Sequence, residues 1–133
     1  MLISRKTDYA LRCLVYLAQQ PAGARVSTAE VSRRLRISRA FLAKIVQRLV
    51  GEKIVKTAKG KGGGLWLVDK GVDLAAIIAL FEPDSCLNKC LSPKFNCFLA
   101  KECPIHRFLA KTQGELLAKF AKVTVGKLAQ KGR

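Results

Sequence analysis

Acidic residues are scarce in this chain. Its 133 residues include 9 Asp and Glu against 25 Lys and Arg, which gives a formal net charge of +16. Such a balance points to a polyanionic partner, most often nucleic acid, with a basic surface kept for solubility as the simpler alternative. A stretch of about 18 apolar residues is also missing, so no transmembrane helix is predicted. No basic amphipathic helix with a wide apolar face stands out, which argues against a membrane partner.

Histidine is almost absent as well. The chain has one, His106, and no paired carboxylates near its cysteines, so no acid–base or nucleophilic group assembles and we do not expect an enzyme. The first residues, 1–6, are not followed by the apolar run of a secretory signal, and we expect a cytoplasmic protein. There, clustered cysteines serve more often as metal ligands or redox-active thiols than as disulfides.

Hydrophobic periodicity predicts a mainly α fold with a small β-hairpin. Serine caps, at Ser27 with Glu30 and at Ser38, open two short helices joined by a tight turn, which is the helix-turn-helix arrangement. Gly51 is expected to close the second of these helices. The tail from Gly126 on is expected to be frayed. The expected helices cover residues 4–19, 28–35, 38–50, 74–81 and 105–123.

The second helix of the pair carries the residue types that read DNA. In this motif the N-terminal part of the recognition helix meets base edges. Arginine can pair with guanine, serine can bond a base edge or a phosphate, and alanine can touch a thymine methyl, whereas lysine and arginine further along reach phosphates. The candidate DNA-binding residues of this helix are Ser38, Arg39, Ala40, Lys44 and Arg48. A generic surface helix is the alternative.

A hairpin directly after the helix-turn-helix predicts a wing. Its strands are expected at 54–58 and 65–68, around a glycine-rich basic tip. Glycines let the backbone approach a narrow minor groove, and lysines supply charge. The candidate wing contacts are Lys59, Lys61, Gly62 and Gly63. The tip lacks the order and the strand-to-helix context of a P-loop. Trp66, on the return strand, is expected to pack or rest on a groove wall rather than stack on bases.

Four cysteines fall between positions 86 and 103: Cys86, Cys90, Cys97 and Cys103. Zinc sites usually contain closer pairs, so this spacing suits a flexible loop around a larger iron–sulfur cluster. Zinc and a bare thiol switch stay open as alternatives. The fifth cysteine, Cys13, lies in an apolar helix pattern and is expected to be buried.

Three motifs in order carry a resemblance: Thr7 to Arg12 (TDYALR), the helix-turn-helix with the glycine-rich tip, and the spaced cysteines ahead of a long helix. This pattern resembles the Rrf2 family of bacterial winged-helix transcription regulators over residues 1 to 125. The resemblance implies a winged helix-turn-helix with a long C-terminal dimerisation helix, a homodimer on a palindromic operator in double-stranded DNA, usually repression, and a 2Fe-2S or 4Fe-4S iron–sulfur cluster.

The resemblance also implies ligands. The three family cysteines map onto Cys90, Cys97 and Cys103, although the first gap is six residues here where five is common. Cys86 is therefore an alternative first ligand or an additional one. The fourth ligand in relatives is either a histidine after the last cysteine, which His106 matches, or an aspartate like Asp8 from the partner subunit. Each residue also has an alternative role without a metal. His106 is then a residue at a helix start, and Asp8 is an acid in a first turn that the helix dipole favours.

These readings divide the chain into a DNA-binding part, residues 1–70, and a dimerisation part, residues 71–133, with the cysteine loop at 84–104. The resemblance further implies that the signal is nitric oxide, redox state, or iron and cluster supply. One alternative is a cluster-free regulator of the same family that uses thiols or zinc. Another is a small iron–sulfur electron-transfer protein, which needs neither the charge nor the wing.

Overall fold

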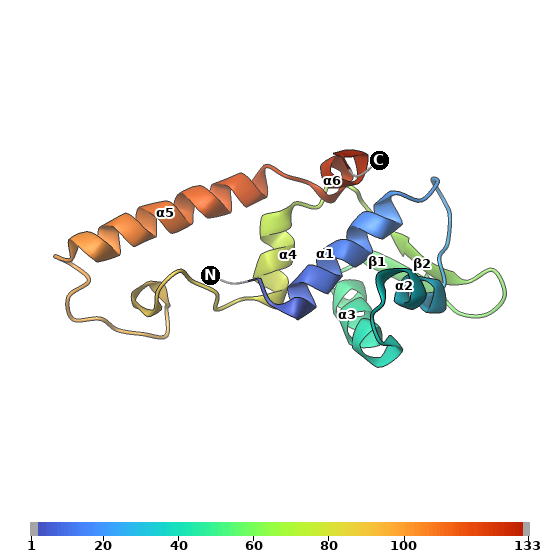
Figure 1. Ribbon diagram of the computed structural model, residues 1–133, viewed down its shortest axis with the longest axis horizontal. Coiled ribbons are helices and arrows are strands. Elements are labelled where there is room, and N and C mark those ends of the chain that lie inside the picture. The colour runs from blue at the N-terminus through green and yellow to red at the C-terminus, as the bar shows by residue number, and fades with distance from the viewer. Residues whose placement is uncertain (1–2, 132–133) are drawn as a thin grey trace.

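The computed structural model describes residues 3–131, and it is mainly helical with one small hairpin, as the sequence predicts (Figure 1). No helix among these residues is long and apolar enough to cross a membrane. Met1, Leu2, Gly132 and Arg133 lie outside the described residues. The elements are α1 (Arg5–Ala18), α2 (Thr28–Leu35), α3 (Arg39–Gly51), β1 (Val55–Ala58), β2 (Gly64–Leu67), α4 (Leu74–Phe81), the 3-10 turn η1 (Lys89–Leu91), α5 (Pro104–Ala121) and α6 (Val125–Lys131).

Polar caps fix where the helices begin. The Ser27 hydroxyl accepts the Glu30 N–H at 3.1 Å, and the Ser38 hydroxyl accepts the Phe41 N–H at 3.2 Å. Each cap satisfies a backbone donor that the first turn of a helix leaves free. Between α2 and α3, Arg36 takes a left-handed conformation with φ 55° and makes the tight turn. Ser4 caps α1 and Asp73 caps α4 in the same way.

The end of α3 differs from the sequence prediction. Gly51 is the last residue of the helix rather than its left-handed stop, and Lys53 takes the positive φ of 60°. Two backbone bonds close this turn, from the Lys53 N–H to the Val50 carbonyl and from the Ile54 N–H to the Leu49 carbonyl. The chain needs this turn to bring β1 back along α3, and the backbone bonds offset the strain on a non-glycine residue.

The hairpin is a two-stranded antiparallel sheet in which Val55 pairs with Leu67 and Ala58 pairs with Gly64. A further bridge joins Leu65 to Val26, which lies in the connection between α1 and α2. Val55 and Leu65 are buried and face the helices. The base of the hairpin therefore packs into the hydrophobic core, whereas its tip is exposed.

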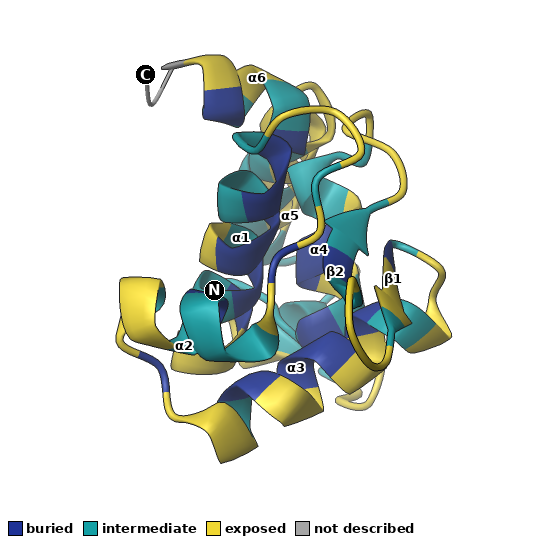
Figure 2. Cartoon of the chain, turned by 90° about the vertical axis from the view of Figure 1, so that its right-hand side faces the viewer, coloured by how far each residue is buried: buried dark blue, intermediate teal, exposed yellow. Residues whose placement is uncertain are grey.

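One hydrophobic core draws on α1, α2, α3, the hairpin, α4 and α6 (Figure 2). Its largest fully buried side chains are Leu14, Leu42, Ile45, Leu49 and Ile77. Cys13 is also fully buried, as expected, and burial raises the pKa of its thiol to about 12. Helix α1 runs through the centre of this core, so it links the helix-turn-helix to α4 and α6.

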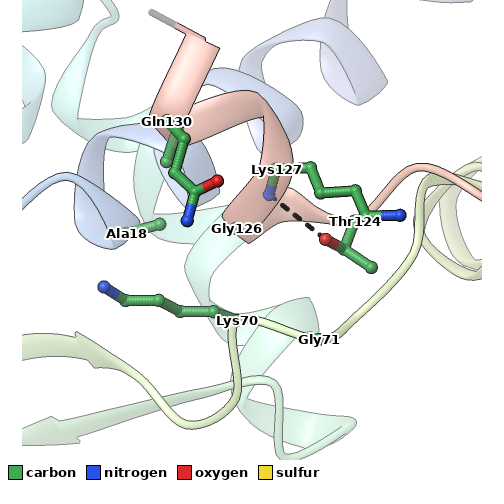
Figure 3. Close-up of a pocket in the computed structure, with 8 residues that line it drawn as sticks. Ala18, Lys70, Gly71, Thr124, Gly126, Lys127 and Gln130 are labelled. Atoms are coloured by element: carbon green, nitrogen blue, oxygen red, sulfur yellow. Dashed lines mark hydrogen bonds between the residues drawn. The ribbon is translucent and has the colours of Figure 1, made fainter. Parts of the chain in front are cut away.

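The prediction of a frayed tail is wrong for residues 126–131. Helix α6 packs against α1, with Val125 fully buried and Ala129 5 % exposed. The Thr124 hydroxyl accepts the Lys127 N–H at 3.2 Å, and the Gly126 N–H donates to the Lys70 carbonyl at 2.9 Å. A pocket of about 410 Å³ lies between α6 and the segment before α4. Figure 3 shows residues that line it. Tertiary packing thus holds a segment whose composition alone favours fraying.

Candidate DNA-binding surface and cysteine loop

The first turn of α3 is open to solvent. Its buried face, formed by Leu42, Ile45, Val46 and Leu49, packs into the core, and the opposite face carries the predicted DNA contacts. Those residues are all exposed: Ser38, Arg39, Ala40, Lys44 and Arg48. Arg48 also lies 3.9 Å from the Glu52 carboxylate, one turn later. A contact of Arg48 with phosphate therefore competes with this exposed ion pair, which is itself weak.

The wing tip presents exposed charge and exposed backbone. Lys59, Lys61 and Gly62 are exposed, whereas Gly63 is half-buried. A side chain at position 63 would overlap the Ala58 carbonyl oxygen, so the hairpin turn itself requires this glycine. Gly62 has nothing nearby that a side chain would meet, and its φ of 81° is the constraint there. Of the two predicted glycine contacts, Gly62 is the one that presents open backbone.

The cysteine loop joins α4 to α5 along the outside of the molecule (Figure 1). As predicted it lacks long elements, with η1 as its one regular turn in the described residues. Its four cysteines, Cys86, Cys90, Cys97 and Cys103, are free and half-buried. Cys103 caps α5, because its sulfur accepts the His106 N–H at 3.4 Å. Four unpaired thiols in one loop give the chemistry of a soft-metal ligand set.

His106 lies in the first turn of α5, three residues after Cys103. Its Nδ1 atom is buried and has no hydrogen-bond partner in the described part of the chain. A buried ring nitrogen without a partner is uncommon, since buried polar atoms are normally satisfied. This nitrogen is available to a group that the single chain does not supply.

The predicted ligands do not converge on one point. Within residues 3–131, no three His, Cys, Asp or Glu side chains lie in an arrangement that could hold a metal ion. The donor set fits an iron–sulfur cluster in kind, through its free thiols and unpartnered imidazole, but not in position within one protomer. The assignment of Cys90, Cys97 and Cys103, with Cys86, His106 or Asp8, stays a prediction.

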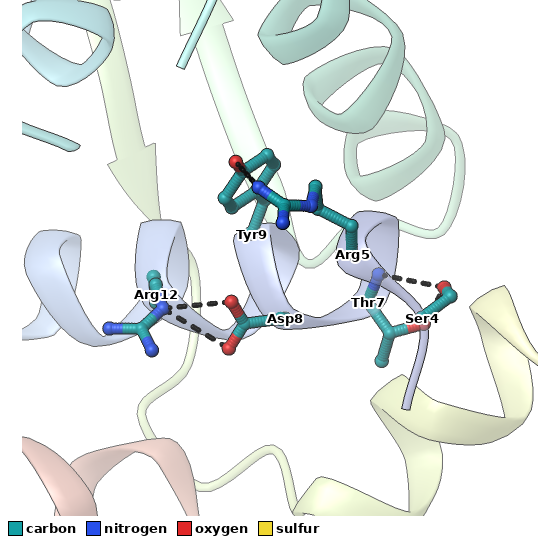
Figure 4. A network of polar contacts seen from close by, with 6 residues as sticks. All are labelled: Ser4, Arg5, Thr7, Asp8, Tyr9 and Arg12. Atoms are coloured by element: carbon teal, nitrogen blue, oxygen red, sulfur yellow. Dashed lines mark hydrogen bonds and ion pairs between the residues drawn. The ribbon is translucent and has the colours of Figure 1, made fainter. Parts of the chain in front are cut away.

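Asp8 already has a partner in its own helix. Its carboxylate accepts two bonds from Arg12 Nε, at 3.0 and 3.1 Å, one turn along α1 (Figure 4). Both side chains are largely exposed, so the pair is held weakly. On the neighbouring face Arg5 donates to the Tyr9 hydroxyl at 3.0 Å. Ligation by Asp8 would require it to leave Arg12.

Glu82 ties the start of the cysteine loop to the start of α1. One of its carboxylate oxygens accepts the Ser4 N–H at 3.0 Å and the Thr7 hydroxyl at 2.7 Å. Thr7 is fully buried. Hydrogen bonds from Ser4, and then from Thr7, hold the pKa of Glu82 below its ordinary range. Movement of the loop at this point is therefore linked to the helix that also contacts the DNA-binding elements.

Helix α5 carries apolar residues that the chain leaves uncovered. None of its 18 residues is buried, and this holds even for large apolar side chains: Ile105 is 65 % exposed and Phe108 is 68 % exposed. Just before it, Phe98 is 91 % exposed. A long helix with exposed large apolar side chains marks an interaction surface.

Comparison with known proteins gives the family of this chain. The model of the Rrf2 family, described as iron-dependent transcriptional regulators, matches residues 3–131. The chain belongs to the Rrf2 family. A member of this family is a DNA-binding transcriptional regulator and not an enzyme, which confirms both sequence predictions.

Solved structures of other regulators share the fold. The oxidized form of CymR from Staphylococcus aureus is 21% identical, with a TM-score of 0.76 over 97% of this chain and 96% of that one. CymR of B. subtilis, described as its global cysteine regulator, is 23% identical, with a TM-score of 0.73 over 98% and 97%. IscR of T. potens is 20% identical, with a TM-score of 0.75 over 100% and 89%. These likenesses confirm the winged helix-turn-helix fold.

Glu82 and Arg25 belong to the site, but the sequence does not predict their roles. Glu82, beside Pro83, indicates only the end of a helix, and no motif includes Arg25. Their partners, Thr7 and Trp66, lie far away along the chain. No local sequence pattern reports such contacts.

Proposed function

We propose that this Rrf2 regulator is a homodimeric repressor whose cysteine loop binds an iron–sulfur cluster. The observation that carries this proposal is the set of four free, half-buried thiols in one loop, together with His106 just after it, whose buried Nδ1 has no partner in residues 3–131. The family description as iron-dependent supports it. The proposed division of labour is residues 1–70 for DNA and residues 71–133, including the loop at 84–104, for dimerisation and sensing, in the cytoplasm.

On DNA, the exposed first turn of α3 reads a half-site and the wing enters the flanking minor groove. Ser38, Arg39 and Ala40 meet base edges, whereas Lys44 and Arg48 bind phosphates. At the wing, Lys59 and Lys61 bring charge, Gly62 allows close approach to the groove, and Gly63 allows the tight turn that presents this backbone. Two copies related by a twofold axis require a palindromic operator, with half-sites about one or more helical turns apart.

In the loop, Cys90, Cys97 and Cys103 are the proposed cluster ligands, with Cys86 as an alternative first ligand. The fourth position falls to His106, whose free Nδ1 supports it, or to Asp8 of a second copy. When bound, a 2Fe-2S or 4Fe-4S cluster supplies a group sensitive to nitric oxide, redox state or iron supply. The thiolates must draw together to bind it, because they do not converge in one protomer.

The position of the cysteine loop allows a rearrangement on cluster binding to affect the DNA-binding elements. It is tied to α1 through Glu82 at one end and leads into α5 at Cys103 at the other. Rearrangement of the loop therefore biases the spacing of the two recognition helices in a dimer. Coupling of this kind is typically worth about 1–3 kcal/mol, or about 5–150-fold in DNA affinity.

A second candidate is a cluster-free regulator of the same family that responds through its thiols or through zinc. The likeness to the oxidized form of CymR favours it, as do the four free cysteines. An electron-transfer role has less support, because the family is one of transcription regulators.

The two candidates separate in a DNA-binding experiment. The full chain is first used to select its operator from a random duplex pool. Affinity for that operator is then measured after anaerobic reconstitution with iron and sulfide, with zinc, and with reductant alone. The cluster proposal predicts that only iron with sulfide changes the affinity, by at least about 5-fold. Equal affinities in the iron and reductant samples, with a change on thiol oxidation, would favour the thiol regulator.

A further inference from the structure

Arg25, in the connection between α1 and α2, contacts the wing at two points. Its guanidinium carbon lies 4.4 Å from the centroid of the Trp66 ring. Its Nη1 atom donates to the Gly62 carbonyl at 3.3 Å. Since Trp66 lies on β2 and Gly62 at the tip, this one side chain spans the wing from strand to tip.

The backbone beside Arg25 is fixed to the same strand. Val26 and Leu65 exchange two backbone hydrogen bonds, from the Val26 N–H at 3.0 Å and from the Leu65 N–H at 2.7 Å. The approach is close: a side chain at position 64 would lie 2.8 Å from the Val26 carbonyl oxygen, so glycine is required there. Arg25 is thus held by its backbone at one end and by Trp66 and Gly62 at the other.

This arrangement leaves most donors of the guanidinium unused. Arginine has five N–H donors, and the Gly62 carbonyl takes one. The ion pairs of the described residues involve Arg12, Arg48 and Lys94 but not Arg25, which is exposed. A guanidinium held over an aromatic ring keeps its remaining donors for an oxyanion, and its ordering is complete before binding.

We propose that Arg25 is a DNA-phosphate contact of the wing and that Trp66 is the positioning residue that holds the guanidinium in place. This inference rests on the proposed DNA-binding role of the wing and extends it from the basic tip to the root of the hairpin. It also gives Trp66 a role other than stacking on bases: its ring face is occupied by Arg25.

The test uses a duplex of arbitrary sequence, because phosphate contacts carry no sequence information. Binding of the full chain to a labelled duplex of about 30 base pairs is followed by anisotropy from about 50 to 200 mM salt. Arg25→Gln should make the plot of log affinity against log salt less steep by about 0.9 per protomer. Its loss of affinity should therefore be about 3.5-fold larger at the lower salt, for each protomer bound.

Two kinds of control variant are needed. One separates the phosphate contact of Arg25 from a general loss of positive charge, and the other tests whether Trp66 holds Arg25 in place. Lys111→Gln removes one exposed positive charge on α5, away from the wing, and should leave the salt slope unchanged. Trp66→Leu keeps every charge but should lower the slope nearly as much as Arg25→Gln. Trp66→Phe keeps an aromatic face and should restore it.

The outcomes decide between these claims. If Arg25→Gln changes the slope no more than Lys111→Gln while the wild type binds, the phosphate contact is refuted and the proposed function stands. A wild-type slope in folded Trp66→Leu refutes the positioning role. Should Trp66→Leu not fold, the fluorescence of Trp66, the single tryptophan, decides instead: its change on adding duplex should shrink in Arg25→Gln. Lack of salt-dependent binding by the wild type would overturn the DNA-binding proposal itself.

Discussion

Helices α3 and α5 differ in how much of their apolar surface the chain itself covers. Four of the 13 residues of α3 are buried in the core, and its polar face is left free for a partner. In α5 none of 18 residues is buried, and large apolar side chains such as Phe108 are exposed. The apolar face of α3 is covered by its own chain, whereas the apolar side chains of α5 are not covered by any described part of the chain.

The same contrast holds for polar groups. The caps of α2 and α3 and the bridge between Val26 and Leu65 satisfy the backbone around the helix-turn-helix. At the start of α5 and in the loop before it, by contrast, His106 Nδ1 has no partner among residues 3–131 and four thiols are free. The polar groups around the helix-turn-helix are therefore satisfied by their own chain, whereas those at the start of α5 remain open to the second copy and the bound group that we propose.

The largest effect should come from a charge on α5. Phe108→Glu would place an unpaired carboxylate in the proposed dimer interface, at a cost of about 3 kcal/mol or more, which raises the dimer dissociation constant at least about 100-fold. Sedimentation equilibrium should show a monomer. Lys111→Gln changes the net charge by the same amount on the same helix and should remain a dimer. A Phe108→Glu protein with wild-type association would show that α5 is covered in another way.

Removing single cysteines sharpens the contrast between the two regions. Cys97→Ala or Cys103→Ala should abolish cluster binding without unfolding the winged helix. Cys13→Ala is the matched control: it should keep the cluster but lower the stability, by about 1–2 kcal/mol, because it removes a buried side chain. Absorption spectra and thermal unfolding measure the two effects. A full cluster spectrum in Cys97→Ala would remove that residue from the ligand set.

A smaller effect should distinguish residues that contact bases from residues that contact phosphates. Arg39→Gln should reduce discrimination at one base position by about 1–3 kcal/mol, whereas Lys61→Gln should weaken all sequences alike. Selection of operators from a randomised pool gives both profiles. Identical specificity profiles for the two variants would contradict the assignment of bases to α3 and phosphates to the wing tip.

The smallest effect concerns the link between the regions. Thr7→Val removes one of the hydrogen bonds to Glu82 and should lower the free energy of unfolding by about 1 kcal/mol at neutral pH. Because these bonds lower the folded pKa of Glu82, their contribution is complete above the ordinary carboxyl pKa and is lost as the pH falls through the lowered one. Urea titrations at neutral and acid pH should show the difference shrinking in acid.

The exposed Thr57 provides the control for this link. Thr57→Val on β1 makes the same chemical change without a bond to an acid, and its effect should not depend on pH. A pH-independent loss in Thr7→Val would mean that packing, and not the Glu82 carboxylate, explains the stability of this contact.

Local signals explain which parts of the fold could be predicted. Ser27, Ser38 and Asp73 begin helices through bonds to residues three positions on, so their pattern is visible in the sequence. Helix α6 was missed because its stability comes from Val125 and Ala129 packing on α1, and two small apolar positions give no clear period. Lys53 was missed because its positive φ follows from the route of β1 rather than from its side chain.

In the site, too, features that depend on local sequence could be predicted, and contacts between distant segments could not. The exposed face of α3 and the basic wing tip follow from periodicity and turn chemistry. The contacts of Arg25 with Trp66 and of Glu82 with Thr7 join distant segments, which sequence spacing does not report. The ligand set stays a prediction, because no three of its candidate groups in residues 3–131 lie where they could hold a metal ion.

The central claim is that the cysteine loop binds an iron–sulfur cluster, and it is tested most directly by counting iron and sulfide. The full chain, purified and reconstituted without oxygen, should show a visible absorption band with matched iron and sulfide, two or four of each per protomer for a 2Fe-2S or 4Fe-4S cluster. A colourless protein that holds neither iron nor sulfide after reconstitution would contradict the claim.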